Sequence, residues 1–243
     1  AAVPAYFYAG YSYYQLVYYG QAVDAWTALI NKFPANNQKA PEAAFRSGDT
    51  YFKALEYDKA ISVFNFVIER YPFSEFGPPS QALVAQCFYN RKQYLNAVRE
   101  YQKFLDLYPT DAQVPSVRKS LETSYYLAGQ EDSTVMEDFL KRFPQSEMAA
   151  EGQYGKGKAL FDAGSYEPAI AELQKAVVNF PGSPTAADAQ LLTAEAYSQM
   201  KRWPDAAQAY LKFLDYFPSM NSVPELPSTL RPHTSIPANT NRA

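Results

Sequence analysis

Apolar residues recur at helical spacing in five segments of this chain. In each segment an alanine is followed by an apolar residue four positions later and by another seven positions later. Offsets of four and seven lie on one face of an α-helix, so each segment is predicted to be an amphipathic helix with alanine at its closest packing contact. The five sets are Ala22, Trp26 and Leu29; Ala60, Phe64 and Val67; Ala97, Tyr101 and Phe104; Ala169, Leu173 and Ala176; and Ala206, Tyr210 and Phe213.

An aromatic-proline pair follows each of these helices and occurs once more at Phe143-Pro144. The residue before a proline disfavours helical geometry, and proline cannot donate the next hydrogen bond, so the pair is predicted to end a helix. A regular period of such pairs indicates one structural unit repeated six times. The prolines, at positions 34, 72, 109, 144, 181 and 218, are 38, 37, 35, 37 and 37 residues apart.

A second helix is predicted upstream of each alanine. Twelve residues before the alanine stands a small residue, and three residues after it a large one. Turn-like segments such as Leu55–Asp58 and Ala163–Tyr166 separate this upstream helix, here called helix A, from the downstream helix B. The upstream pairs are Gly10 and Tyr13, Gly48 and Tyr51, Ala85 and Phe88, Gly157 and Leu160, and Ala194 and Tyr197.

This spacing resembles the tetratricopeptide repeat, over roughly residues 4–218. The resemblance implies an all-α, right-handed superhelical solenoid of six helix-turn-helix units. The predicted units are residues 1–34, 35–72, 73–109, 110–144, 145–181 and 182–218. Residues 219–243, which are rich in Pro, Ser and Thr, are predicted to form a tail or linker without a core of its own.

The chain departs from the family pattern in two ways. Most of its units have 37 residues where the family has about 34, and the extra residues are expected between helix B and the next helix A, as in Phe73–Pro79. The fourth unit is degenerate, because Glu122 takes the small position and Asp132 the alanine position. It also lacks two residues near Gly129-Gln130, and Asp132 and Ser133 are expected to cap a shortened helix B.

Composition argues against several classes of protein. The net charge of −3 and the lack of a basic face argue against nucleic-acid binding. No apolar run is long enough to span a bilayer. Cys87, the only cysteine, is expected to be a buried structural thiol. Because the chain opens with Ala1 and not with Met, we expect a processed protein or a fragment of a longer one.

The sequence offers no catalytic constellation. The only histidine, His233, lies in the predicted tail, and no Cys/His cluster has metal-ligand spacing. Gly152–Lys158 matches the first seven positions of a phosphate-binding loop, but Ala159 replaces the required Ser or Thr and no strand is predicted before it. We therefore predict a non-enzymatic protein with no catalytic residue, cofactor, metal or small-molecule substrate.

In the family, helices A line a concave groove that binds a partner. The resemblance implies an aromatic groove of mixed charge, suited to an extended peptide or a helix of another protein. The Lys and Asn clamp with which some members hold a C-terminal carboxylate is missing. The alternative is that half of these aromatic residues only pack between neighbouring helices A. The groove residues carried over are Phe45, Asp49, Phe52, Lys53, Gln86, Tyr89, Asn90, Tyr154, Lys158 and Phe161, with Phe7, Tyr11, Tyr14 and Gln15 in the first unit.

Both ends of the array lack the polar cap that a solenoid needs. The first unit is rich in tyrosine and almost uncharged, and the sixth passes directly into the predicted tail. We therefore expect the ends to contact another protein or a missing part of the same one. The candidate end contacts are Tyr8, Tyr11, Tyr14 and Tyr18.

The 37-residue units, each with an aromatic-proline stop and then a polar loop such as Pro144–Ser146, resemble repeats of bacterial cell-envelope proteins. Examples are the periplasmic partner of the Tol–Pal system and the lipoprotein of the outer-membrane β-barrel assembly machine. The resemblance implies a periplasmic or outer-membrane-associated scaffold or adaptor that holds protein partners. The alternative is a structural subunit fixed permanently inside a large envelope complex or filament.

Overall fold

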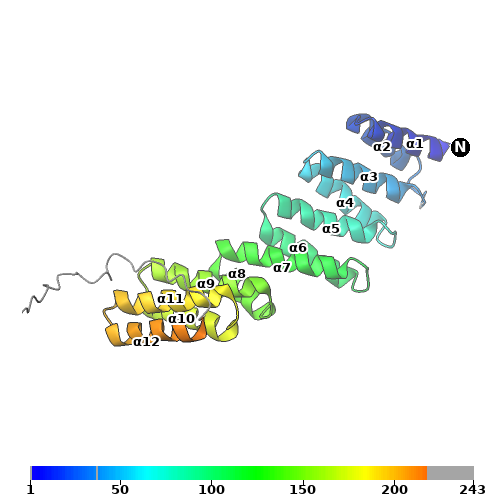
Figure 1. Cartoon of the computed structure of the whole chain (residues 1–243). Helices are drawn as coiled ribbons and strands as arrows, with labels where there is room; N and C mark the ends of the chain where they lie inside the picture. The colour runs from blue at the N-terminus through cyan, green and yellow to red at the C-terminus, as the bar shows by residue number, and fades with distance from the viewer. Residues whose placement is uncertain (1, 37, 218–243) are drawn as a thin grey trace, which may run out of the picture. The chain divides into compact units, whose positions relative to one another are not determined.

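The structure, a computed structural model, describes residues 2–36 and 38–217. Within these ranges the chain forms twelve α-helices and no β-strand, and the helices follow one another as pairs (Figure 1). The predicted all-α repeat fold is therefore confirmed, while the predicted tail and His233 lie outside the described residues. The helices are α1 (Ala2–Gln15), α2 (Tyr19–Lys32), α3 (Ala40–Lys53), α4 (Tyr57–Arg70), α5 (Gly77–Asn90), α6 (Tyr94–Leu107), α7 (Val114–Glu131), α8 (Ser133–Arg142), α9 (Glu147–Asp162), α10 (Tyr166–Asn179), α11 (Pro184–Gln199) and α12 (Trp203–Tyr216).

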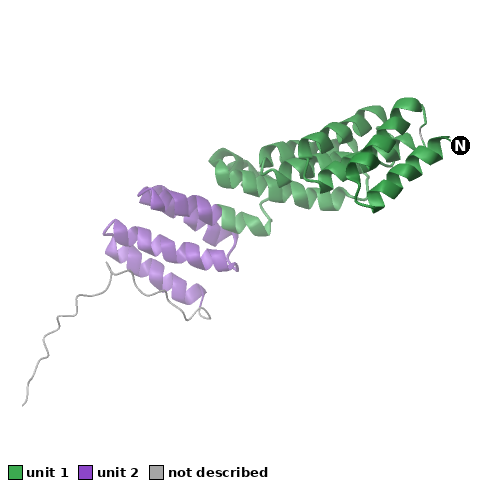
Figure 2. Ribbon diagram, turned by 90° about the horizontal axis from the view of Figure 1, so that it is seen from above, with its two compact units in different colours: residues 1–152 green, residues 153–243 purple. Residues whose placement is uncertain are grey.

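The chain divides into two compact units, residues 1–152 and 153–243 (Figure 2). The division falls inside α9, so this one helix contributes to both units.

Within a pair, helix B places a bulky side chain on the small residue of helix A. A Cβ atom added to Gly48 would stand 2.6 Å from the Phe64 ring, and one added to Gly10 would stand 2.4 Å from the indole of Trp26. No larger residue fits at these contacts without moving the ring. The five alanines predicted to lie at close helix contacts are all buried, which confirms the repeat alignment at Ala22, Ala60, Ala97, Ala169 and Ala206.

Each helix B ends at the aromatic residue that precedes the proline, as predicted. This residue leaves helical geometry, with φ between −133° and −125°, while its backbone N–H still bonds the carbonyl four residues earlier. The proline that follows has no N–H to continue the ladder. The six stop residues are Phe33, Tyr71, Tyr108, Phe143, Phe180 and Phe217.

The turns from helix A to helix B are shorter than predicted. Tyr57 and Tyr166 are the first residues of α4 and α10 and do not belong to the turns. In five of the six pairs the turn contains one residue with positive φ. This residue is a glycine in only one of the five turns, and the five residues are Val17, Leu55, Lys92, Gly164 and Lys201. The next N–H bonds a carbonyl five residues back, as from Glu56 to Tyr51 at 2.9 Å, which is the Schellman helix end.

The fourth pair lacks this turn. Helix α7 runs on through Gly129 and Gln130, which the sequence analysis had placed between the helices. Asp132 alone links α7 to α8, and its carboxylate accepts a hydrogen bond from the backbone N–H of Thr134 at 2.8 Å. Asp132 is therefore the predicted cap, while Ser133 is already helical. Hydrogen bonds from Thr134 hold the pKa of Asp132 below its ordinary value.

The extra residues of the long units are not all in loops. Gly77, Pro78 and Pro79 form the first turn of α5, although Phe73–Pro79 was predicted to be a connection. Proline is suited to the first turn, where its missing N–H would have no helical partner. The longer repeat therefore lengthens helix A at its start as well as the loop before it.

Ser80 of α5 is fully buried, and its hydroxyl has no hydrogen-bond partner among the described residues. Replacing Ser80 with alanine should leave the free energy of unfolding unchanged or raise it by up to about 1 kcal/mol, because an unpaired buried hydroxyl carries a desolvation penalty. The matched control is Ser124→Ala, which removes a buried hydroxyl that donates to the Ser120 carbonyl at 2.7 Å. The control should lose about 0.5–1.5 kcal/mol in urea unfolding followed by circular dichroism. An equal loss in both variants would contradict the assignment.

Candidate protein-binding surface

The predicted groove residues of the second, third and fifth units lie on their helices A, namely α3, α5 and α9, and none of these ten residues is buried. The five aromatic rings are partly exposed, and Lys53, Asn90 and Lys158 are exposed. Their shared register therefore presents aromatic and polar surface in the described part of the chain. Their role in binding a partner stays a prediction.

Part of each groove ring is used inside the molecule. An aromatic residue near the end of helix A packs on the first residue of its own helix B in four pairs, with ring centroids 5.4–5.7 Å apart. Phe45 instead lies within 6 Å of both Phe64 and Phe76. Intramolecular packing thus accounts for one side of these rings. The four pairs are Tyr14–Tyr19, Phe52–Tyr57, Tyr89–Tyr94 and Phe161–Tyr166, and their constant five-residue spacing was a sequence signal that the analysis missed.

A polar network joins three helices beside the groove residues of α5. The Tyr101 hydroxyl donates to Gln86 Oε1 at 3.0 Å, and Gln86 Nε2 donates to Asn90 Oδ1 at 2.9 Å. Asn90 Nδ2 in turn reaches the Tyr57 hydroxyl at 3.4 Å. Burial raises the pKa of Tyr101 to about 12, although a hydrogen bond with Ser120 opposes this shift. Tyr101 therefore keeps its proton and remains a donor at neutral pH.

Two adjoining hollows, of about 330 and 310 Å³, open beside this network between α5, α6 and α7. Both are lined by Gln86, Tyr101 and Ser120, and the second also by Tyr89. Tyr101 was predicted only as a core residue of helix B, and Ser120 was not among the predicted groove residues. Two features of the sequence could have indicated a polar site here. The bulky position of helix B is a tyrosine at Tyr101, whereas Phe64 and Leu173 have no hydroxyl, and Gln86 follows the small position of helix A.

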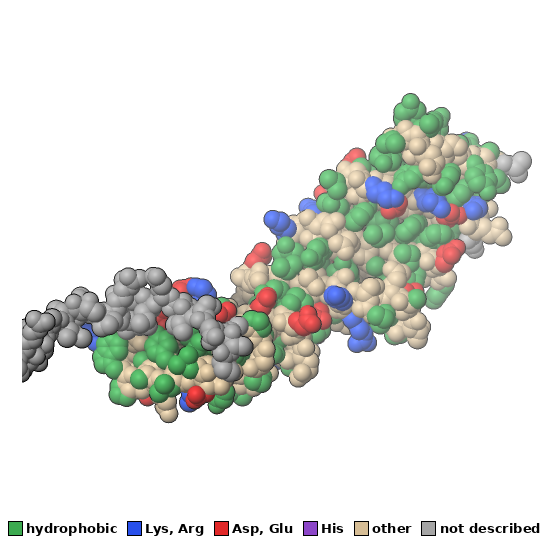
Figure 3. All heavy atoms as spheres, viewed as in Figure 1, with side chains coloured by type: hydrophobic (Ala, Val, Ile, Leu, Met, Phe, Trp, Pro, Cys, Tyr) green, Lys and Arg blue, Asp and Glu red, His purple; other side chains and the backbone are tan. Residues whose placement is uncertain are grey.

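The charged groove residues form ion pairs with one another. Lys53 lies 2.8 Å from Asp49 and also donates to the Tyr14 hydroxyl, and Lys158 lies 2.8 Å from Asp162. Hydrogen bonds to Asp49 and then to Tyr14 raise the pKa of Lys53 to about 12. On the face shown in Figure 3, Lys and Arg side chains lie close to Asp and Glu, and no large patch carries one sign of charge. The charged groove residues Asp49, Lys53 and Lys158 are therefore largely neutralised by neighbouring charges of opposite sign.

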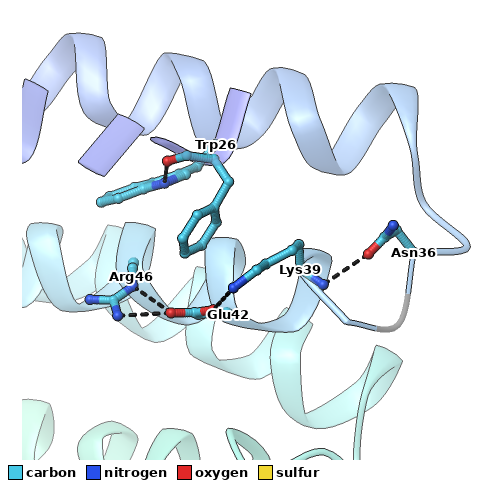
Figure 4. A network of polar contacts seen from close by, with 6 residues as sticks. Trp26, Asn36, Lys39, Glu42 and Arg46 are labelled. Atoms are coloured by element: carbon cyan, nitrogen blue, oxygen red, sulfur yellow. Dashed lines mark hydrogen bonds and ion pairs between the residues drawn. The ribbon is translucent and has the colours of Figure 1, made fainter. Parts of the chain in front are cut away.

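The first pair differs from the prediction at Phe7. Its ring is buried beside Trp26, whose indole N–H donates to the Phe7 carbonyl at 3.1 Å, so Phe7 cannot face a ligand. Lys39, the residue before α3, places its ammonium group 4.2 Å from the centre of this ring, and Glu42 of α3 binds both Lys39 and Arg46 at 2.8 Å (Figure 4). Burial would raise the pKa of Glu42, but these hydrogen bonds outweigh it and lower the pKa.

Three of the four candidate end contacts, Tyr8, Tyr11 and Tyr18, are exposed. Tyr14 is only partly exposed, because its ring packs near Trp26 and Tyr19 and its hydroxyl bonds Lys53. An apolar surface remains at the N-terminal pair.

The second unit contains a hollow that the sequence analysis did not predict. It has a volume of about 350 Å³, lies between α10, α11 and α12, and includes none of the predicted groove residues. Its lining includes Gln174, Gln190, Thr193, Tyr197, Asp205 and Lys212.

The other sequence candidates have structural explanations. Cys87 is buried as predicted, and burial raises the pKa of its thiol to about 12. Residues 152–158 lie inside α9, so their backbone N–H groups serve the helix and cannot form a phosphate loop. Within residues 2–36 and 38–217 there is no group of His, Cys, Asp and Glu side chains arranged to hold a metal ion. No helix in the same ranges is long and apolar enough to cross a membrane.

Paired helices with a small-on-bulky contact and an aromatic-proline stop define a tetratricopeptide-repeat protein, a class that serves as protein-interaction scaffolds. The chain belongs to the YfiO family of outer membrane lipoproteins, whose sequence profile matches residues 37–151 and 146–226. No curated protein sequence matches the chain.

Three solved structures illustrate the likeness to known proteins. The TPR2AB domain of yeast Sti1, in a complex with pHSP90, is 18% identical over 90% of this chain and 92% of its own, with a TM-score of 0.42. MamA from Desulfovibrio magneticus RS-1 is 16% identical over 91% and 98%, with a TM-score of 0.39. BtubC from P. vanneervenii is 14% identical over 88% and 93%, with a TM-score of 0.38.

Proposed function

We propose that this chain is a non-enzymatic scaffold that binds protein partners in the bacterial periplasm or at the outer membrane and helps to assemble an envelope complex. Membership of the YfiO outer membrane lipoprotein family is the observation that carries the proposal. The fold supports it, because a helical-repeat array offers an extended surface.

The partner would bind over α3, α5 and α7 as an extended peptide or a helix. The hollows beside Gln86 and Tyr101 are bordered by donors, acceptors and partly exposed rings. Such a surface suits a chain that inserts side chains into hollows and satisfies its polar groups against Gln and Tyr. A photo-crosslinking amino acid at position 89 should therefore capture an envelope protein. The control position is Phe66 on α4, which is also exposed but is not a groove residue.

Phe52→Ala combined with Tyr89→Ala should reduce the binding free energy of the captured partner by about 1–3 kcal/mol, because aromatic residues in an interface tend to carry its binding energy. Both rings pack on the first residue of their own helix B and against the neighbouring core, and both keep exposed surface. The affinity is measured by titration calorimetry, and Phe66→Ala serves as the control. Unchanged affinity in the double variant, or equal crosslinking from positions 66 and 89, would rule this surface out.

A structural subunit fixed permanently in a larger complex is the second candidate function. The exposed apolar side chains of the last helix, Leu211, Leu214 and Tyr216, favour it. The two functions differ in whether the purified chain is soluble without its partners.

A further inference from the structure

Consecutive helix pairs meet where helix B of one pair packs against helix A of the next, and this contact is here called a joint. All the described joints are built alike. Within the two units the structure describes four such joints, α2–α3, α4–α5, α6–α7 and α10–α11. In each joint helix A presents the same three positions to the preceding helix B. They lie five residues before, one residue before and two residues after the small position of helix A. The side chains there are at most 5% exposed, and they are Ala43, Ser47 and Thr50; Ser80, Val84 and Cys87; Val117, Leu121 and Ser124; and Ala189, Thr193 and Ala196.

Helix α1 carries the same face without a helix B on it. Its residues at the three positions are Ala5, Ala9 and Ser12, which resemble the small residues of the α2–α3 and α10–α11 joints but are exposed. Tyr8, on the same side of the helix, and Leu16, directly after it, are also exposed, and α1 contains no charged residue. The α1 face, defined as Ala5, Tyr8, Ala9, Ser12 and Leu16, is therefore built like the receiving half of a joint.

Helix α12 carries the opposite half of a joint, the face that a helix B presents to the next helix A. In α2, α4, α6 and α10 the next helix A covers two apolar positions, occupied by Val23 and Ile30, Ile61 and Ile68, Val98 and Leu105, and Ile170 and Val177. The corresponding residues of α12 are Ala207 and Leu214, and both are exposed, Leu214 by 53%.

Two further α12 residues extend this apolar stripe. Leu211 is 61% exposed and stands where the other helices have Thr27, Asn65, Gln102 and Gln174. Trp203 is 54% exposed, because Ser198 occupies the place of the aromatic residue that packs on Tyr57 or Tyr94 in other pairs. The α12 face, defined as Trp203, Ala207, Leu211 and Leu214, is thus apolar and exposed at all four positions.

We propose that a second copy of this chain covers these faces, with α12 of one copy packed on α1 of the next. The two faces are the complementary halves of the joint that the chain forms four times within its own units, and neither contains a charged residue. A joint of this head-to-tail kind leaves one free half at each end, so copies add in series. The inference goes beyond the proposed function and does not depend on the groove.

Sedimentation velocity of the full 243-residue chain, from low to tens of micromolar, tests the association. The average mass should rise with concentration. Leu214→Glu and Ala9→Glu each place a charge on one face and should weaken association at least tenfold. The matched controls are Val178→Glu and Ala171→Glu, at exposed positions of α10 outside both faces, and should associate like the unmodified chain. Circular dichroism checks that all four variants are folded.

Mixing the two face variants distinguishes this joint from a symmetric dimer. Leu214→Glu keeps an intact α1 face and Ala9→Glu keeps an intact α12 face, so an equimolar mixture should form one-to-one dimers and grow no further. A mixture that remains monomeric would overturn the proposal. So would an unmodified chain that is monomeric at every concentration, or a loss of association in the controls equal to that in the face variants.

Discussion

Replacing Trp26 with alanine is expected to lower the free energy of unfolding of the N-terminal helices by about 3–5 kcal/mol, which would be the largest effect of a single substitution considered for this chain. The indole is 1% exposed and packs with Phe7, Leu29 and Ala43. Its N–H also satisfies the Phe7 carbonyl at 3.1 Å. The substitution therefore removes a hydrogen bond as well as a large buried ring, and it leaves a cavity between α1, α2 and α3.

The loss should be concentrated near the substitution, because each pair of a repeat array contacts only its neighbours. Hydrogen exchange with mass spectrometry should show faster exchange in α1–α3 and little change in α10–α12. The chain's other tryptophan supplies the control. Trp203 is half exposed, and in dilute solution Trp203→Ala should change stability by less than about 0.5 kcal/mol. A comparable loss in both variants would contradict the packing described for Trp26.

Replacing Gly157 with alanine should destabilise the second unit by about 1–2 kcal/mol. A Cβ atom there would stand 2.7 Å from two side-chain atoms of Leu173 and 3.1 Å from its backbone nitrogen. Leu173 is itself fully buried and has no room to withdraw. Overpacking of about 2–3 kcal/mol then outweighs the gain of about 1 kcal/mol that alanine brings to a helix interior.

Gly155 lies two residues away on the same helix and provides the matched control. A Cβ atom added to Gly155 meets nothing within 4 Å. Gly155→Ala should therefore raise the free energy of unfolding by about 1 kcal/mol, since only the helix preference changes. Urea unfolding followed by circular dichroism should show the two midpoints moving in opposite directions. If Gly157→Ala also stabilised the protein, the close approach of α9 and α10 would be wrong.

The candidate binding surface was predicted in part. The family register placed Gln86, Tyr89 and Asn90 on one side of α5, and the structure joins two of them in a polar network. The hydroxyls of Tyr101 and Ser120 were not predicted, because they come from α6 and α7 and enter the site only when three helices pack. Phe7 was predicted to face a ligand, yet Lys39 and Trp26 enclose it, because the register alone does not tell whether long side chains of the next pair fold over a ring.

The sequence by itself determined the repeat, the helix pairs, their aromatic-proline stops and the buried alanines. These features depend on residues within about one repeat of each other, where helical periodicity and the geometry of proline leave few alternatives. Only the tertiary structure decided which equivalent positions are covered. Ala9 and Ser47 share one register, yet Ala9 is exposed while α2 covers Ser47. Likewise, Leu55 adopts positive φ without any signal in the sequence. Positive φ costs a non-glycine residue roughly 1–2 kcal/mol in steric strain, and the Schellman hydrogen bonds and the packing of the helix pair compensate for this cost.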